Sequence, residues 1–284
     1  MPKLVLALSL PFLVALSHPR ATSWGHEPVQ ADTQSVTFKS KAPAVGDKYT
    51  STEDMLMAMT VAAGGNSIDV EVHETEERKT EVVAVSDGLA KRIRVKYASH
   101  KKETRAQGKS TAEASPVSGK SYFVERKGDV LVVTGIDGKS VSPAEQEHVA
   151  KSYKRLGKPD EITRTLKSKP RKVGEKLDDV AQALADQFKE RSSETGEKAT
   201  IQETKLVFTE VKKIDGVEHA VLDLTLKMGT ESAKGVKLSM DLKGKVLVRV
   251  EEASHGEINM SGPIKVAGSA NGGGSVTLKT KTGP

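Results

Sequence analysis

Much of the chain alternates apolar and polar residues, a pattern typical of β-strands that bury one face. The clearest run is Met55–Val61, in which every second residue is apolar. A Gly-Gly-Asn turn signal at 64–66 separates it from Ile68–Val72, where apolar residues alternate with charged ones. We predict a hairpin with one apolar and one charged face.

Further hairpins are predicted at four glycine-containing turns, each between two strand-like runs. Two turns read Asp-Gly, at Asp87-Gly88 and Asp215-Gly216, and two read Lys-Gly, at Lys127-Gly128 and Lys243-Gly244. Asp-Gly readily adopts the positive φ angles that two-residue hairpin turns need. The stretch Ser99–Gly119, by contrast, is rich in Lys, Ser, Ala and Thr, and we predict a polar loop there.

Helices are predicted at three places. Ser142-Pro143-Ala144-Glu145 forms a capping box with proline at the first helical position. A short helical turn is expected over Glu161–Leu166, and an amphipathic helix begins at Asp178-Asp179. The predicted fold class is α+β: predominantly antiparallel, curved β-sheet hairpins packed on two or three helices.

The chain carries signs of an internal duplication. Val45-Gly46-Asp47-Lys48-Tyr49 is echoed by Val173-Gly174-Glu175-Lys176-Leu177, and the same spacing separates the two Asp-Gly turns. We therefore divide the chain into a first β-rich half, 36–168, and a second, 169–284. The alternative is coincidence among similar hairpins.

The first residues have the plan of a secretory signal. A short basic start precedes an apolar stretch, Leu4–Leu16, which is too short to span a bilayer comfortably. We predict a signal peptide over 1–17, cleaved after Ser17, and a flexible lead-in over 18–35; an uncleaved amphipathic anchor is the alternative. No later segment is predicted to be transmembrane. The expected location is exported, periplasmic or secreted, and soluble after cleavage.

Composition and charge exclude several classes of function. Cysteine is absent, so disulfides, thiolate metal sites and cysteine nucleophiles are excluded. Lys+Arg number 44 against 38 Asp+Glu, a net charge of +6 that is spread along the chain. The densest basic stretch, Lys91–Lys102, is interpreted as a solvated strand face and loop. We expect no nucleic-acid partner, because binding would need a dense basic stripe interleaved with aromatic residues.

Motifs for catalysis and cofactors are missing. Gly-Lys-Ser triplets begin at Gly108, Gly119 and Gly138, but none has the glycine five residues earlier that a phosphate-binding loop needs. A Gly-x-Ser-x-Gly nucleophile elbow is also absent. We predict no catalytic residue and no cofactor.

The histidines do not form a recognised ligand pattern, and no metal site is predicted. The richest cluster is His73-Glu74 with Glu76 and Glu77, interpreted as a solvated face with a weak surface metal site as the alternative. Glu145 and His148 lie one helical turn apart and are interpreted as a plain surface pair.

The methionine row is the candidate ligand-binding site. Met55, Met57 and Met59 share one face of a predicted strand, and flexible, polarizable thioethers adapt to varied apolar ligands. The alternative is that the row packs against the helices as ordinary core.

The order of motifs resembles a group of uncharacterised exported bacterial proteins built as two β-rich halves. The resemblance runs from Val45 to about Val266: a Val-Gly-Asp-x-Tyr phrase, long hairpins, a Pro-x-x-Val-Gly-Glu phrase, a helix and a second Asp-Gly hairpin. It implies no catalytic residue. A more distant architectural likeness is to LolA-type lipoprotein carriers.

These observations favour an exported, non-enzymatic envelope protein that binds an apolar ligand or a partner protein. The second hypothesis is a structural or assembly module without a small ligand. The third is a metal-dependent hydrolase acting through His73.

Overall fold

The computed structural model describes residues 34–63, 65–192, 198–231 and 235–283. The signal peptide predicted over 1–17 and almost all of the lead-in predicted over 18–35 lie outside these residues. The elements are β1 (Ser35–Val36), β2 (Lys48–Ala63), β3 (Asn66–Ser86), β4 (Leu89–Ala106), β5 (Lys109–Glu113), β6 (Ser121–Lys127), β7 (Val130–Gly135), α1 (Pro143–Ser152), α2 (Glu161–Leu166), β8 (Arg171–Lys172), α3 (Asp178–Ser192), β9 (Lys198–Ile214), β10 (Val217–Glu231), β11 (Val236–Arg249), β12 (Ser254–Gly268) and β13 (Asn271–Gly283).

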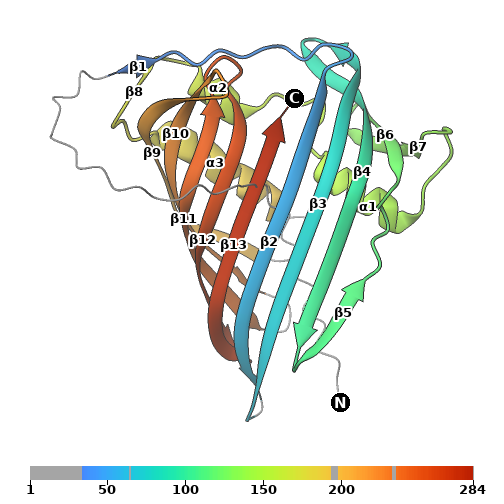
Figure 1. Ribbon diagram of the computed structural model, residues 1–284, viewed down its shortest axis with the longest axis vertical. Coiled ribbons are helices and arrows are strands. Elements are labelled where there is room, and N and C mark those ends of the chain that lie inside the picture. Colours follow the sequence, from blue (N-terminus) through green and yellow to red (C-terminus); the bar gives the residue numbers. More distant parts are fainter. Residues whose placement is uncertain (1–33, 64, 193–197, 232–234, 284) are drawn as a thin grey trace.

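One curved, eleven-stranded antiparallel sheet dominates the molecule, in the order β7-β6-β4-β3-β2-β13-β12-β11-β10-β9, with β5 paired to β4. Helices α1, α2 and α3 lie on the same side of the sheet, which we call the inner face (Figure 1). The predicted α+β class with antiparallel pairing is therefore confirmed. Strands from both predicted halves belong to this one sheet, because β13 pairs with β2.

Close strand approach, rather than a turn, explains the Lys243-Gly244 pair. Strand β11 runs straight through Gly244, so the hairpin predicted there is wrong. A Cβ at Gly244 would lie 1.9 Å from the Asn259 carbonyl oxygen of β12, and one at Gly274 would lie 2.0 Å from that of Ala58 in β2. Only glycine permits this approach, and such glycines let a sheet bend sharply.

The polar loop predicted over Ser99–Gly119 is also wrong in large part. Strand β4 continues to Ala106, turns at Gln107-Gly108 with φ angles of 53° and 73°, and returns as β5. Both faces of this hairpin are polar, so no apolar alternation marked it. Backbone pairing and cross-strand ion pairs such as Lys102–Glu113, 2.9 Å, hold it in place.

The repeated phrase forms the same local structure twice. The Gly46 N–H donates to the Val82 carbonyl, and the Gly174 N–H donates to the Phe208 carbonyl. In each copy the strand residue donates back, Val82 to Asp47 and Phe208 to Glu175. Gly46 and Gly174 have φ angles of 91° and 86°. The likeness is local, and duplication of whole halves stays a prediction.

Two apolar clusters lie on the inner face. The larger one lies under α2 and α3 and contains Met55, Met57 and Met59 together with residues from β9 to β13. The smaller one lies under α1, where Val149 packs on Val95 and Val124 of β4 and β6. The larger cluster thus draws on both predicted halves. Among the helices that are described, none is long and apolar enough to cross a bilayer.

Candidate metal centre

A row of polar residues crosses the inner face between the two apolar clusters. Strand register aligns Thr280 of β13 with Glu53 of β2, Glu53 with Glu76 of β3, and Glu76 with His100 of β4. Since residues in register on adjacent strands share one face, the four side chains form a line. Met55, two residues after Glu53, begins the methionine row on the same face. The inner face of β2 therefore changes from polar to apolar between Glu53 and Met55, which are successive residues on that face.

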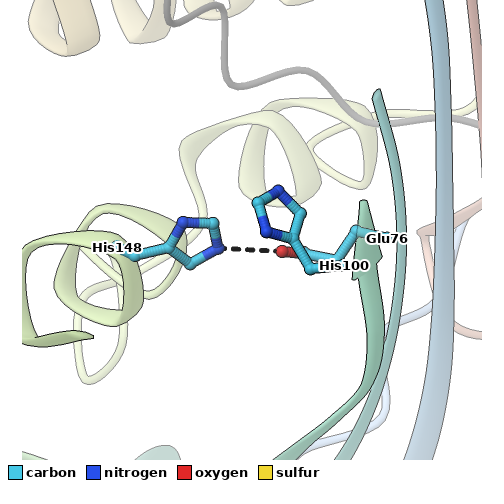
Figure 2. A group of neighbouring side chains, drawn as sticks. All are labelled: Glu76, His100 and His148. Atoms are coloured by element: carbon cyan, nitrogen blue, oxygen red, sulfur yellow. Dashed lines mark hydrogen bonds and ion pairs between the residues drawn. The ribbon is translucent and has the colours of Figure 1, made fainter. Parts of the chain in front are cut away.

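Helix α1 adds a second imidazole above this row. Its start is fixed by the predicted capping box, in which the Ser142 hydroxyl accepts from the Glu145 N–H and the Glu145 carboxylate accepts from the Ser142 N–H. Val149, fully buried, anchors the helix to the sheet. The preceding residue, His148, points at the sheet, and its Nε2 lies 2.9 Å from Glu76 Oε2 (Figure 2).

Glu76, His100 and His148 form the centre of the site. One ligand atom from each lies within 4.8 Å of the others. Glu76 and His100 are buried, and the His148 side chain keeps 24% of its surface exposed. The His100 and His148 rings lie side by side, with centroids 4.7 Å apart. Two strands and a helix thus present three potential ligands to one point, which still has a path to solvent.

Glu76 is held as a carboxylate. Its Oε1 accepts from Arg78 Nε at 2.9 Å, while Oε2 faces His148. Burial by itself raises the pKa of Glu76, but the His148 hydrogen bond and the Arg78 charge outweigh it and the net pKa is lowered. The group is therefore available as an anionic ligand.

His100 has a partner at each ring nitrogen. Nδ1 lies 2.9 Å from Ser115 Oγ and Nε2 lies 3.0 Å from Glu74 Oε1. The Ser115 hydroxyl oxygen already accepts from the Val117 and Ser118 N–H groups, so its own proton is left to donate to Nδ1. Burial alone lowers the pKa of His100, but the Glu74 hydrogen bond and the charges of Glu76 and Glu74 raise it above its ordinary value.

Charged side chains of both signs line the site. The Arg78 guanidinium lies 3.3 Å from Glu53 Oε2 and 2.9 Å from Glu76 Oε1, and Glu74 Oε1 lies 3.0 Å from His100 Nε2. Lys102, next to His100 on the same face, lies opposite Glu74 and is paired with Glu113. The site therefore offers carboxylate oxygens as well as imidazole nitrogens to a cation.

A buried hydroxyl ends the polar row at β13. Thr280 is 3% exposed, and its Oγ1 has no hydrogen-bond partner in the described part of the chain. Strand β2 separates it from Glu76, so it lies outside the group of three potential ligands.

The donor chemistry suits a transition-metal ion. Two imidazoles and a carboxylate are the ligands of catalytic zinc sites and of related iron centres. Bonds of about 2.1 Å require ligand atoms about 3.4 Å apart, so small side-chain rotations would bring the three atoms onto one ion. Ser115 on His100 and Arg78 on Glu76 provide the outer hydrogen bonds that orient metal ligands.

The predicted ligand residues lie next to this centre, within the apolar core. Met55, Met57 and Met59 are 4%, 1% and 4% exposed. An open hollow of about 370 Å³ lies at the far end of β2; Met59 contributes to its lining, which also contains polar residues such as Asp69 and Arg105. Whether the row binds a ligand stays a prediction.

The alternative metal residue, His73, lies elsewhere. It projects from the outer face, half exposed, with its Nε2 3.1 Å from Asp54 Oδ1. Glu74 and Glu76, its neighbours at odd spacing, point inward to the centre. Glu145 and His148 do not form the predicted surface pair. Glu145 accepts hydrogen bonds from Lys120 and Tyr122, whereas His148 contacts Glu76.

A signal for the missed centre was present in β3. Val70, Val72, Glu74, Glu76 and Arg78 follow one another at a period of two, so an apolar face turns charged midway. A charged stretch on a core-facing side needs partners. No pattern in the sequence named those partners.

Comparisons with known proteins give no family. No family model matches the chain, and no curated protein sequence matches it. Similar solved structures include DynF from the dynemicin biosynthesis pathway of Micromonospora chersina, with 9% identity, 96% of both chains covered and a TM-score of 0.22.

Two further structures are also similar only at low scores. A DUF1329 family protein from Desulfovibrio piger has 8% identity, with 82% of this chain and 83% of that chain covered and a TM-score of 0.13. MucB in complex with MucA has 9% identity, with 82% and 93% covered and a TM-score of 0.11. At these scores the likenesses support no conclusion about this chain.

Proposed function

We propose that this chain is an exported, non-catalytic protein that binds a divalent transition-metal ion through Glu76, His100 and His148. The observation that carries the proposal is the convergence of these three side chains, from β3, β4 and α1, within 4.8 Å. The resemblances to uncharacterised exported proteins and to LolA-type carriers stay hypotheses and do not define the ligand.

The scaffold favours selective binding. The ligands come from two adjacent strands, in register, and from a capped helix that is anchored by buried Val149. Ligands on regular elements hold their geometry better than ligands on loops. Imidazole donors favour zinc, copper, nickel or iron over the oxygen-preferring magnesium and calcium ions.

The test is a titration with Zn²⁺, or with Co²⁺ as a coloured probe, in a buffer that does not bind metals. We expect one equivalent to bind and, for Co²⁺, visible absorption bands of a nitrogen- and oxygen-ligated ion. His148→Ala should weaken binding by at least about 100-fold, more than the loss of an outer-shell contact. Glu76→Gln provides a second variant, and circular dichroism verifies that each variant is folded.

The matched control is His73→Ala, which removes an imidazole from the outer face of the same sheet. It should leave affinity and absorption unchanged. Two results would exclude the interior site. One is an equal loss of metal affinity in His73→Ala and His148→Ala. The other is unchanged metal affinity in both His148→Ala and Glu76→Gln.

A second candidate function follows from the methionine row. The candidate is the binding of a small apolar ligand by Met55, Met57 and Met59, which share one buried face of β2. We propose that such a ligand would be detected as lipid released from the purified protein or as uptake of a hydrophobic probe. If neither occurs and Met57→Lys unfolds the protein, the row is core only. A protein partner likewise stays a prediction.

A further inference from the structure

The outer face of the sheet holds a second hollow, of about 650 Å³, which is independent of the metal centre. It lies over β2, β3, β4 and β6, and its lining includes Lys48, Lys79, Arg94, Lys96 and Phe123. A volume of this size is within the usual range for small-molecule sites, about 300–1,000 Å³. These side chains alternate along their strands with residues of the inner face, so the sheet itself separates the hollow from Glu76 and His100.

Positive charge in the hollow exceeds negative charge. Arg94 is paired with Glu81, the acidic residue of the lining. Lys79 has a loose contact with Glu77 at 3.5 Å, both of them exposed. Lys48 and Lys96 have no ion pair within the described ranges. Lys48, Lys79 and Lys96 therefore leave the hollow strongly cationic.

Two of these lysines are set against each other by the sheet register. Lys79 of β3 lies directly opposite Lys96 of β4. Like charges directly opposite on neighbouring strands destabilise a sheet. An anion bound between them would remove that cost, so the pair is better suited to a liganded state than to an empty one.

Apolar groups border the same hollow. Phe123 of β6 forms part of its lining, and the Arg92 guanidinium lies 4.4 Å from the Phe123 ring centroid. Ile136, which follows β7, also contributes to the lining and is 61% exposed. The hollow thus combines a cationic floor with an apolar rim.

We propose that this hollow binds a small organic anion in which a carboxylate, phosphate or sulfate group adjoins an apolar or aromatic body. The anionic group would lie between Lys79 and Lys96, and the apolar body would lie against Phe123 and Ile136. The same chemistry is offered by a free small molecule and by the head group of an anionic lipid. A compact hollow lacks the length that a nucleic-acid strand needs.

The probe is 8-anilinonaphthalene-1-sulfonate, a sulfonated aromatic dye whose fluorescence rises on binding. The double variant Lys79→Gln/Lys96→Gln should weaken binding about fivefold to tenfold, since it removes two exposed charge contacts. Added salt should weaken the wild-type interaction and have less effect on the variant. Ile136→Ser should weaken dye binding and leave the binding of inorganic phosphate unchanged.

The matched control is Lys237→Gln/Lys245→Gln, which removes the same net charge from β11. Both control lysines are exposed, to 60% and 59%. Their loss should leave dye affinity unchanged. Equal weakening of dye binding in both double variants overturns the proposal, and so does a Lys79→Gln/Lys96→Gln variant that binds both the dye and anionic vesicles as wild type does.

Vesicles separate the two sources of the anion. If dye binding depends on Lys79 and Lys96, the site takes free organic anions. If vesicles of anionic phospholipid bind in the same variant-dependent way but the dye does not, the site takes lipid head groups. If neither probe responds to the two lysines, the hollow is not an anion site. Zinc binding at the inner face is measured separately, so failure here leaves the metal proposal intact.

Discussion

Two buried groups of charged residues show how differently the same residue types can be used. One is centred on Arg171 of β8, which has no exposed side-chain surface, and the other on Glu76. Both combine a guanidinium with carboxylates on the helix-bearing side of the molecule. They differ in whether potential ligand atoms converge on one point that a cation could reach.

The Arg171 group is saturated. Nε donates to the Leu166 carbonyl, one terminal nitrogen donates to Glu175 and Asp179, and the other donates to Asp179 and the Thr165 carbonyl. A guanidinium has five N–H donors, and each has an acceptor. Lys169, 3.5 Å from Glu175, balances the second carboxylate. This group joins α2, β8 and α3 and has no capacity left for a ligand.

The Glu76 group is arranged differently. Glu76, His100 and His148 each present one potential ligand atom within 4.8 Å of the others, and the His148 side chain keeps 24% of its surface exposed. A protein that needed only rigidity could have used the balanced arrangement of Arg171. The difference is the reason for proposing a binding role for the Glu76 group, and four predictions test that distinction.

The largest effect is expected from Arg171→Met. Removing one partner of a buried ion pair costs roughly 3–5 kcal/mol, and Asp179 would lose its two charge-assisted hydrogen bonds. Urea unfolding should show this loss equally with and without Zn²⁺. If Zn²⁺ restored the lost stability, Arg171 would contribute to the metal centre. The distinction between a structural Arg171 group and a binding Glu76 group would then be wrong.

Met57 tests the apolar neighbour of the centre. Met57→Ala should lower the free energy of unfolding by about 2–5 kcal/mol, because the side chain is 1% exposed within the large cluster. Met57→Leu, the volume-conserving control, should cost less than about 1.5 kcal/mol. A stable Met57→Ala protein that no longer takes up a hydrophobic probe would instead favour a ligand site on the row.

Ser115→Ala probes the outer shell of the metal centre. The Ser115 hydroxyl orients His100 through Nδ1, and losing such a contact weakens metal affinity by about 10–100-fold. The coordination spectrum with Co²⁺ should keep its form, since no ligand is lost. Ser118→Ala is a useful comparison, because that hydroxyl contacts the His100 backbone N–H and not the ring. Equal affinities for wild type and Ser115→Ala would contradict the proposed orientation.

The smallest effect concerns pH and helix α1. Hydrogen bonds from the Ser142 hydroxyl and backbone N–H, and then from Lys120 and Tyr122, lower the pKa of Glu145 to about 2. Because the folded pKa lies below the ordinary value, the stabilisation is present above about pH 4.5 and is lost as pH falls toward 2. Glu145→Gln should cost about 1 kcal/mol at pH 7, the typical value of a helix cap.

The same variant supplies its own check. The stability difference between wild type and Glu145→Gln should shrink as urea unfolding is repeated at lower pH. A difference that stays constant from pH 7 to pH 2.5 would show that the capping carboxylate does not titrate as described. Zn²⁺ affinity measured at pH 7 should change little, since Glu145 is not a ligand.

The sequence was sufficient to predict those strands and helices that depend on residues close to one another in the chain. The alternation of Met55–Val61 is visible within a few residues, and the capping box at Ser142 and Glu145 spans a single turn. Gly244 shows the limit of such local reasoning: Lys-Gly is typical of a turn, but the glycine is needed because a neighbouring strand passes too close for a Cβ. That requirement arises only when the sheet is assembled.

The metal centre lay beyond local patterns for a related reason. Glu76 and His100 meet through strand register, and a bulge at Glu77/Arg78 shifts that register just beside them. His148 joins them only because α1 docks through Val149 onto β4 and β6. The inward row of Glu74, Glu76 and Arg78 could be read from the sequence, but its partners could not.

The most direct test is a crystal structure of the protein with Zn²⁺, using anomalous scattering at the zinc edge. The account predicts one strong peak about 2.0–2.2 Å from His148 Nε2, from a His100 ring nitrogen and from a Glu76 carboxylate oxygen. The peak should disappear in His148→Ala and persist in His73→Ala. A peak confined to the exposed His73–Asp54 pair, or no peak on the inner face, would contradict the proposed metal centre.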